Sequence, residues 1–226
     1  MTETLLKGFR EFCADAYDSE SNVMGKLVEE GQNPEYFIIS CIDSRSNPGT
    51  IFRPAPGTFM AYKAIGAIVR PYQKGTALAA ALQFALHHVN VRKIILLGHT
   101  RCGAINALVD NVDDPDIAGF IDVAQTALSK ARSECGPTPD REELQHRVEE
   151  QLVMLSLKNL ETYPSVAPLL EDGSLEIVPW LFELETGTLK KFAPETQTFS
   201  PVPGQTEHKH YRRTTARNCL MRRSAR

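Results

Sequence analysis

Apolar and polar residues follow one another along this chain in a way that is typical of an α/β fold. Residues 36–41 and 93–98 are short runs of mainly aromatic and aliphatic side chains, as in strands buried on both faces. A longer apolar stretch, residues 76–89, lies between them and has the length of a helix. A strand, a helix and a second strand in this order predict a parallel sheet with helical crossovers, which binds ligands at the carboxyl ends of its strands.

The same periodicity predicts the remaining elements. Residues 1–33 contain two amphipathic helical stretches, the second ending at Gly31, whose apolar stripe cannot stand alone in water. Further helices are expected at residues 102–110, 117–134 and 140–160 and near Pro164 and Pro168, extended runs at residues 59–62 and 64–69, and a hairpin or edge strand at residues 175–184 and 188–192. Prolines and glycines make residues 48–57 an expected irregular segment.

These elements predict the fold class α/β, with a mostly parallel central sheet flanked by helices, an N-terminal helical arm and a C-terminal edge strand or hairpin. A chain of 226 residues is long enough for one sizeable core. The expected organisation is therefore a helical arm over residues 1–33, one domain over residues 34–200 and a tail over residues 201–226.

Charge is distributed unevenly along the chain. The formal net charge is −3, yet residues 201–226 carry seven Lys or Arg against a single acid, Glu207. This segment has too little apolar content to build a core, so we expect a disordered basic tail. Such a tail is either simply solvated or docks an acidic partner, a nucleic acid or a membrane surface.

Composition narrows the class of protein and its compartment. No run of about 18 apolar residues suggests a membrane span, and the first residues lack the basic and apolar regions of a secretory signal. The five cysteines are few and odd in number, which argues against a disulfide framework. We therefore expect a soluble, cytoplasmic protein whose cysteines are buried or bind a metal.

Two short motifs at the ends of predicted strands carry the candidate chemistry. Cys41 ends the first strand, and His99 and Cys102 follow the second. Zinc favours thiolate and imidazole ligands, and a catalytic zinc site uses three protein ligands and leaves a fourth position open. These three residues therefore predict a Zn²⁺ site, with Cys102 at a helix N-terminus that should lower the pKa of its thiol.

Asp43 and Arg45 lie on the loop that follows Cys41 and are the candidate catalytic residues. An arginine paired with a carboxylate orients it and keeps it ionised. Asp43 could then accept a hydrogen bond from hydroxide at the metal and hold that oxygen for attack on a substrate, since zinc makes such a nucleophile available near neutral pH.

Together, the motifs Cys41-Ile-Asp-Ser-Arg45 and Gly98-His-Thr-Arg-Cys102 resemble those of the beta-class carbonic anhydrases. The resemblance covers roughly residues 25–192 and includes residues 31–34, Pro56-Gly57, the helix 75–88, residues 156–164, Trp180 and Thr186-Gly187. It implies reversible hydration of carbon dioxide to bicarbonate and a proton by zinc-bound hydroxide. It also implies a closed resting form in which Asp43 is the fourth zinc ligand.

The resemblance further implies a substrate pocket and an assembly. By position, the pocket residues are Gln32, Met60, Ile65, Phe84 and Gly103. In this family the N-terminal helices wrap a partner subunit and the active site lies near the dimer interface. We therefore expect residues 1–33 to serve in a dimer or a tetramer.

The chain departs from the family pattern at three positions of the pocket wall, where Lys63, Ala64 and Ala67 replace an arginine and two asparagines. Lysine lacks the bidentate fork of arginine, and alanine has no amide. Two alternatives therefore stay open beside carbon dioxide hydration: a hydrolase of carbonyl sulfide or carbon disulfide with the same fold, and a non-catalytic zinc-binding interaction protein.

Overall fold

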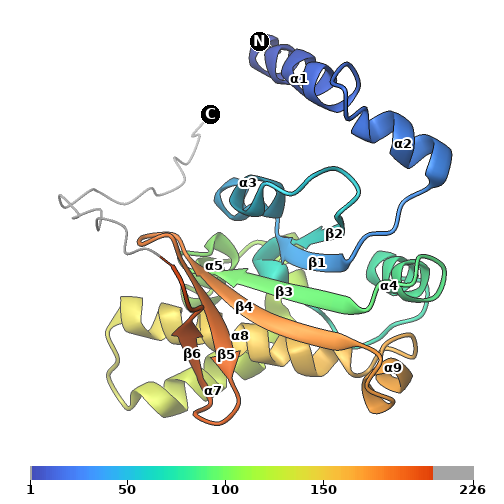
Figure 1. Ribbon diagram of the computed structural model, residues 1–226. Coiled ribbons are helices and arrows are strands. Elements are labelled where there is room, and N and C mark those ends of the chain that lie inside the picture. The colour runs from blue at the N-terminus through green and yellow to red at the C-terminus, as the bar shows by residue number, and fades with distance from the viewer. Residues whose placement is uncertain (1, 206–226) are drawn as a thin grey trace.

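One six-stranded sheet organises residues 2–205, which are the residues that this computed structural model describes (Figure 1). The strands are β1 (Tyr36–Cys41), β2 (Phe59–Ala64), β3 (Lys93–His99), β4 (Glu176–Glu183), β5 (Thr188–Ala193) and β6 (Thr198–Pro201), in the spatial order β2-β1-β3-β4-β5-β6. The first four strands run parallel, and β5 and β6 are added antiparallel. The predicted fold class is confirmed.

Helices cover both faces of the sheet. They are α1 (Glu3–Ala16), α2 (Val23–Glu30), α3 (Pro48–Phe52), α4 (Ala77–His87), α5 (Gly103–Val109), α6 (Pro115–Ile121), α7 (Gln125–Cys135), α8 (Arg141–Leu160) and α9 (Ala167–Glu171). Alternate residues of a strand point to opposite faces, so Phe37 and Leu96 pack against α4 and α8, whereas Ile38 and Leu97 face α3. β1 and β3 are therefore buried on both sides, as their apolar runs predict.

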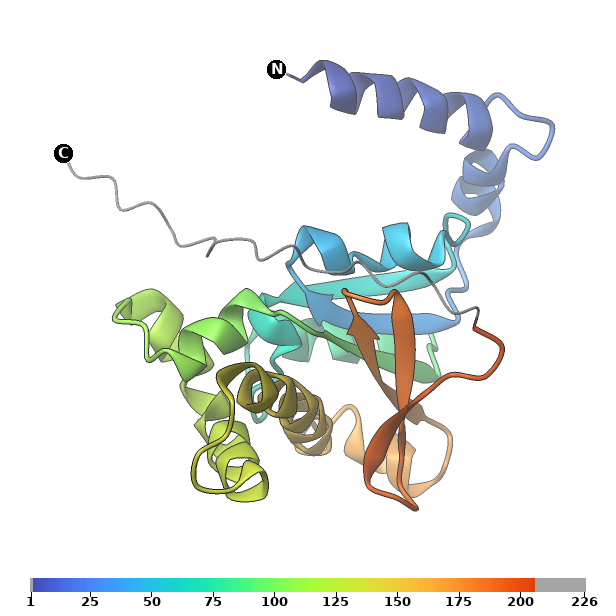
Figure 2. The same ribbon diagram turned by 90° about the vertical axis from the view of Figure 1, so that its left-hand side faces the viewer.

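The N-terminal arm formed by α1 and α2 extends away from the body of the molecule (Figures 1 and 2). Four apolar side chains of α1 are exposed: Leu5, Leu6, Phe9 and Phe12. The second helix ends where predicted, since Gly31, with φ of 84°, follows the end of α2, and Asn22 caps its start. The arm thus presents an apolar stripe that nothing in residues 2–205 covers.

The expectation of an irregular segment at residues 48–57 is wrong for its first half. Residues Pro48–Phe52 form α3, preceded by a 3-10 turn over Ser44–Ser46. Proline is well suited to the first position of a helix, and the Asn47 side chain accepts a hydrogen bond from the Gly49 N–H at 2.9 Å. The prediction rested on the prolines and glycines alone and did not consider Asn47 as a cap.

Three further boundaries differ from the prediction. The two extended runs at residues 59–69 are one strand, β2, followed by a 3-10 turn over Ile65–Ala67 in which Gly66 and Ala67 have positive φ. The helix expected at residues 117–134 is divided into α6 and α7 by a 3-10 turn over Asp122–Ala124. Strand β6 was not predicted, because its only pairing partner is the edge of β5.

Within residues 2–205, no helix is both long enough and apolar enough to cross a membrane. The basic segment from residue 206 onward, with Glu207, lies outside the described residues.

Candidate metal centre

Three candidate ligand residues converge at the carboxyl edge of the sheet. Cys41 is the last residue of β1, His99 is the last residue of β3, and Cys102 is the N-cap of α5. β1 and β3 are parallel neighbours, with Ser40 opposite Leu97, so both strands end at the same edge. The two sulfurs and one imidazole nitrogen lie within 4.8 Å of one another, and all three residues are at most 4% exposed.

The hydrogen bonds of His99 leave one ring nitrogen available for a metal. Nδ1–H donates to the Thr100 carbonyl oxygen at 2.8 Å, which places the lone pair on Nε2. Nε2 is buried and has no hydrogen-bond partner among the described residues. Buried polar atoms are almost always satisfied, so an orphaned nitrogen facing two thiols fits a metal cation.

The two thiols differ in their ionisation. The Cys102 thiol and His99 lower the pKa of Cys41 well below its usual range, and the Gly66 N–H donates to Cys41 Sγ at 3.2 Å. The neighbouring Cys41 sulfur and burial raise the pKa of Cys102. The backbone N–H groups of Ala104 and Ile105 at the start of α5 lower the pKa of Cys102, as expected, but the Cys41 sulfur and burial outweigh them in the metal-free site. A divalent cation would supply the positive charge that lets both sulfurs ionise.

Asp43 and Arg45 form a bidentate pair beside this cluster. Arg45 donates from Nε to Oδ1 at 3.0 Å and from its terminal nitrogen to Oδ2 at 2.7 Å, and its backbone N–H donates to Oδ1 at 2.8 Å. These hydrogen bonds lower the pKa of Asp43 to about 2. Arg45 also donates to the carbonyl oxygen of Arg101 at 3.2 Å, which connects the pair to the loop that carries the other two ligands.

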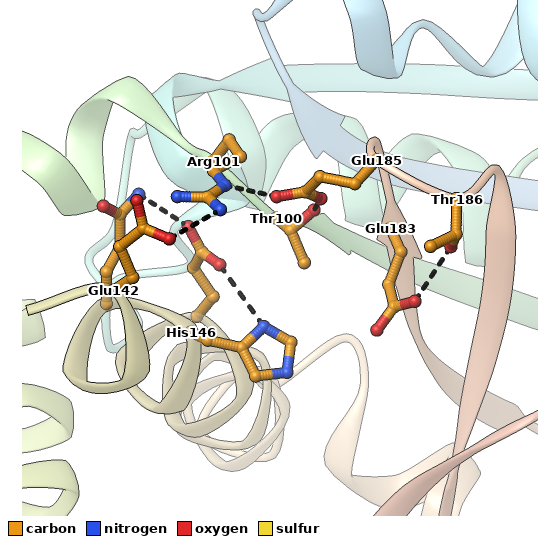
Figure 3. Close-up of a pocket in the computed structure, with 9 residues that line it drawn as sticks. Thr100, Arg101, Glu142, His146, Glu183, Glu185 and Thr186 are labelled. Carbon is orange, nitrogen blue, oxygen red and sulfur yellow. Dashed lines mark hydrogen bonds and ion pairs between the residues drawn. The ribbon is translucent and has the colours of Figure 1, made fainter. Parts of the chain in front are cut away.

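A shell of acidic residues surrounds the loop between His99 and Cys102 (Figure 3). The Thr100 hydroxyl donates to Glu185 at 2.6 Å, and Arg101 forms ion pairs with Glu185 and Glu142. The Cys102 N–H donates to the buried Glu149 at 3.0 Å. A cavity of about 200 Å³ opens beside these groups.

The acidic residues of this shell were missed by the sequence analysis. Burial raises the pKa of Glu149 to about 7. The partial burial of Glu185 raises its pKa, but the hydrogen bonds from Thr100 and Arg101 have a larger, opposite effect. The net result is a lowered pKa for Glu185. The sequence signal for Glu149 is its position as a carboxylate on the apolar side of helix 140–160. The sequence carries no such signal for Glu185, because its partners lie 84 and 85 residues away.

The predicted pocket residues fall into two groups. Ile65 and Gly103 lie at the metal edge, since Ile65 follows the end of β2 and Gly103 follows Cys102. Gln32, Met60 and Phe84 are not brought to the metal cluster within one chain. Met60 lies four residues before Ala64, which pairs with Cys41, so it is about 13 Å from that edge at 3.3 Å per residue.

The other two distant residues face solvent. Gln32 is exposed in the segment between α2 and β1, at the amino end of the strand. Phe84 is 51% exposed on the outside of α4, where its ring stacks on His88.

The three departures from the expected pattern lie on β2 and its end. Lys63 is opposite Ser40, and the buried Ala64 is opposite Cys41. Ala67 is also buried and closes the 3-10 turn that carries Gly66. The substitutions therefore border the metal edge and leave Cys41, His99 and Cys102 unaltered.

Comparison with known proteins agrees with this geometry. The family model described as carbonic anhydrase matches residues 36–189. A carbonic anhydrase of Pseudomonas aeruginosa is 29% identical over 223 residues, covering 89% of this chain and 97% of that protein. Carbonic anhydrase 1 of Escherichia coli is 27% identical, covering 88% and 91%. Beta carbonic anhydrase 5 of Arabidopsis thaliana is 29% identical over 74% of this chain, which spans 57% of that longer protein.

Solved structures share the fold. The beta-carbonic anhydrase CcaA superposes with a TM-score of 0.78 at 24% identity, covering 88% of this chain and 98% of its own. A tetrameric beta-carbonic anhydrase of the fungus Sordaria macrospora gives a TM-score of 0.76 at 24% identity, covering 84% and 96%. The matched family model spans more than half of the chain, from the strand that ends at Cys41 to the hairpin beside the metal edge. The chain belongs to the beta-class carbonic anhydrase family.

Proposed function

We propose that this protein catalyses the reversible hydration of carbon dioxide to bicarbonate and a proton, with Zn²⁺ held by Cys41, His99 and Cys102. One observation carries the proposal: two buried thiols and an orphaned imidazole nitrogen meet at one point, beside a carboxylate gripped by an arginine. A catalytic zinc site has three such soft or borderline protein ligands and a fourth position for water or substrate.

When bound, the metal would supply Lewis-acid chemistry that makes hydroxide available near neutral pH. The chain's own residues then orient the reactants. Asp43, kept ionised by Arg45, would accept the proton of the attacking oxygen in a hydrogen bond and so aim its lone pair at the carbon of carbon dioxide. Arg45 in turn is held by the Arg101 carbonyl. We also propose a closed resting form, in which Asp43 would serve as a fourth residue holding the metal.

We propose that the complete substrate pocket needs a second copy of the chain. Ile65 and Gly103 border the metal within one chain, whereas Gln32, Met60 and Phe84 do not reach it. The arm of α1 and α2 exposes an apolar stripe, with Leu5 75% exposed, that a partner copy would cover. Self-association as a dimer or a tetramer would bury this stripe, and the Sordaria relatives are tetrameric.

The compartment and the tail are proposed on chemical grounds. Both ligand thiols must stay reduced to bind metal, which favours the reducing cytoplasm as the place of function. The basic tail expected over residues 201–226 is a candidate for docking an acidic partner.

Stopped-flow measurement of carbon dioxide hydration on metal-quantified protein tests the proposed function. We expect one zinc per chain and fast turnover in the wild type. We expect the same zinc content but strongly reduced turnover in Asp43→Ala, because the ligands remain while the orienting group is lost. A rise in activity only above about pH 8 would support the closed resting form.

A second substrate class is favoured by one specific observation, the replacement of polar family residues by Lys63, Ala64 and Ala67 next to the metal edge. A less polar wall suits carbonyl sulfide or carbon disulfide, which are linear and less polar analogues of carbon dioxide. Hydrolysis of these gases by protein that does not hydrate carbon dioxide would establish that alternative. Zinc binding without turnover of any of the three gases would instead indicate the non-catalytic interaction protein.

A further inference from the structure

The loop that joins His99 to Cys102 is held in an uncommon backbone conformation. Arg101, directly before Cys102, has φ of 56°, in the left-handed region that arginine seldom adopts. Such a conformation persists only where the surroundings hold it in place. The spacing of the two ligands around one metal therefore depends on contacts made by Thr100 and Arg101.

One carboxylate contacts both of these residues. Oε2 of Glu185 accepts the Thr100 hydroxyl at 2.6 Å, and Oε1 accepts Arg101 Nε in an ion pair. Thr100 is buried and is also tied to β4, because its N–H donates to the Phe182 carbonyl oxygen at 3.0 Å. Its hydroxyl accepts the N–H of Leu184, in the turn after β4, at 3.0 Å. Glu185, from the turn between β4 and β5, thus fixes the two residues that lie between the metal ligands (Figure 3).

The contacts of Glu185 continue inward to the metal centre along two routes. The Thr100 carbonyl oxygen accepts His99 Nδ1–H, so the position of Thr100 sets the orientation of the imidazole. The Arg101 carbonyl oxygen accepts a hydrogen bond from Arg45, so the position of Arg101 sets that of the arginine that grips Asp43.

We propose that Glu185 is a positioning residue for the metal centre, acting through Thr100 on the His99 imidazole and through Arg101 on the Asp43–Arg45 pair. This inference rests on the proposed function, in that it assumes a metal on Cys41, His99 and Cys102. It assigns a role in the site to a residue of the hairpin turn that does not touch the ligands themselves.

The chain offers a matched control two residues away. Glu183 faces the same cavity, but it pairs with Lys190 and accepts the Thr186 hydroxyl at 2.9 Å. It has no hydrogen bond or ion pair to Thr100 or Arg101. Glu183→Gln therefore removes the same charge from the same cavity without disturbing the ligand loop.

The test compares Glu185→Ala, Glu185→Gln and Glu183→Gln as full-length proteins. Zinc affinity is measured by competition with a chelator, the geometry of the site by the absorption spectrum of Co²⁺-loaded protein, and the fold by the melting temperature of metal-free protein. Loss of a group that orients a metal ligand typically weakens metal affinity by about 10- to 100-fold. We expect a loss in that range and an altered Co²⁺ spectrum for Glu185→Ala.

Glu185→Gln should fall between Glu185→Ala and the wild type, since the amide offers one acceptor oxygen and retains one of the two contacts. It also provides the readout if Glu185→Ala does not fold. Glu183→Gln should match the wild type in affinity and spectrum.

Two results would overturn the positioning role. One is an unchanged affinity and Co²⁺ spectrum in both Glu185 variants, and the other is an equal change in Glu183→Gln. A lowered melting temperature with an unchanged spectrum would reduce Glu185 to a structural turn residue. A wild type that binds neither Zn²⁺ nor Co²⁺ would instead contradict the proposed function. A wild type that binds metal but shows no turnover would contradict only the proposed activity, because the Co²⁺ spectrum would still test the positioning role of Glu185.

Discussion

Arg45 grips Asp43 through two parallel hydrogen bonds, from Nε to Oδ1 at 3.0 Å and from its terminal nitrogen to Oδ2 at 2.7 Å. The planar guanidinium therefore fixes the plane of the carboxylate as well as its position. Because the pair also lowers the pKa of Asp43 to about 2, the carboxylate is ionised throughout the neutral range. Arg45, two residues away, thus fixes the orientation of the Asp43 carboxylate and keeps it ionised.

Arg45→Lys is expected to lower kcat/KM for carbon dioxide by roughly 100-fold, because lysine provides a single point of contact and leaves the carboxylate free to rotate. Zinc content should stay at the wild-type value, since Arg45 is not a ligand. Stopped-flow assays on protein of known zinc content check both statements. Wild-type turnover in Arg45→Lys would show that the bidentate geometry is not needed.

Removal of a ligand should abolish metal binding. Cys41→Ser and His99→Ala are expected to leave substoichiometric zinc, as measured by atomic spectroscopy after dialysis. A metal that binds only the folded chain stabilises it by about 2.7 kcal/mol at 100 times its Kd. A chelator should therefore lower the melting temperature of the wild type and leave that of the ligand variants unchanged.

The control for ligand removal is Cys135→Ser, a half-buried thiol near the end of α7 that takes no part in the metal cluster. It should keep full zinc content. Equal zinc loss in Cys135→Ser would place the metal elsewhere.

Gly98→Ala should destabilise the protein and disturb the metal centre together. A Cβ at this position would lie 2.4 Å from Cγ2 of Val153 on α8, which is far inside van der Waals contact. Overpacking of this kind costs about 1–3 kcal/mol. Since Gly98 precedes His99 directly, a shift of the strand that relieves the clash would also move His99. The free energy of unfolding, measured by chemical denaturation, and the affinity for zinc should both fall.

Gly103→Ala is the matched comparison, because an added Cβ there meets no atom within 4 Å in the same chain. Its stability should equal or slightly exceed that of the wild type, since alanine favours helix more than glycine does. If Gly103 lines the substrate pocket as we propose, KM for carbon dioxide should rise while the melting temperature does not fall. An unchanged KM would remove Gly103 from the pocket.

The apolar stripe of α1 predicts how the protein assembles. Phe9→Glu places a charge in the middle of the stripe, where Phe9 is 60% exposed in the single chain. If a partner copy covers this residue, the substitution should reduce the mass measured by light scattering after size-exclusion chromatography. Glu11→Gln, on the same helix and 65% exposed at its side chain, should leave the mass unchanged. A wild type that is already a monomer would contradict the proposed assembly.

Much of the fold could be predicted because local patterns were unambiguous. The strand at residues 36–41 and the helix after the Asp140 cap were found with nearly correct bounds, since an uninterrupted apolar run and a capping aspartate are both local signals. Helix α3 was missed because the prolines and glycines around it predict an irregular segment and five residues are too few to show a helical period. Strand β6 could not be found, because a four-residue edge strand is stabilised by its neighbour rather than by its own sequence.

The order of residues alone was enough to predict the candidate metal ligands and the candidate catalytic pair, and the structure brings both groups together. Cys41 and His99 each end a strand, and parallel strands bring their carboxyl ends to one edge, so residues 58 positions apart could be expected to meet. The Asp43–Arg45 pair is local, and its geometry follows from a separation of two residues.

Only folding revealed what holds the ligands in place. Glu149 and Glu185 reach the loop between His99 and Cys102 from α8 and from the hairpin turn, and neither contact is periodic or local. Side-chain contacts between distant segments depend on the angles at which helices and strands pack, and those angles are set by the whole core rather than by any one segment. For this physical reason the ligands follow from the sequence, whereas the groups that orient them follow from the packed structure.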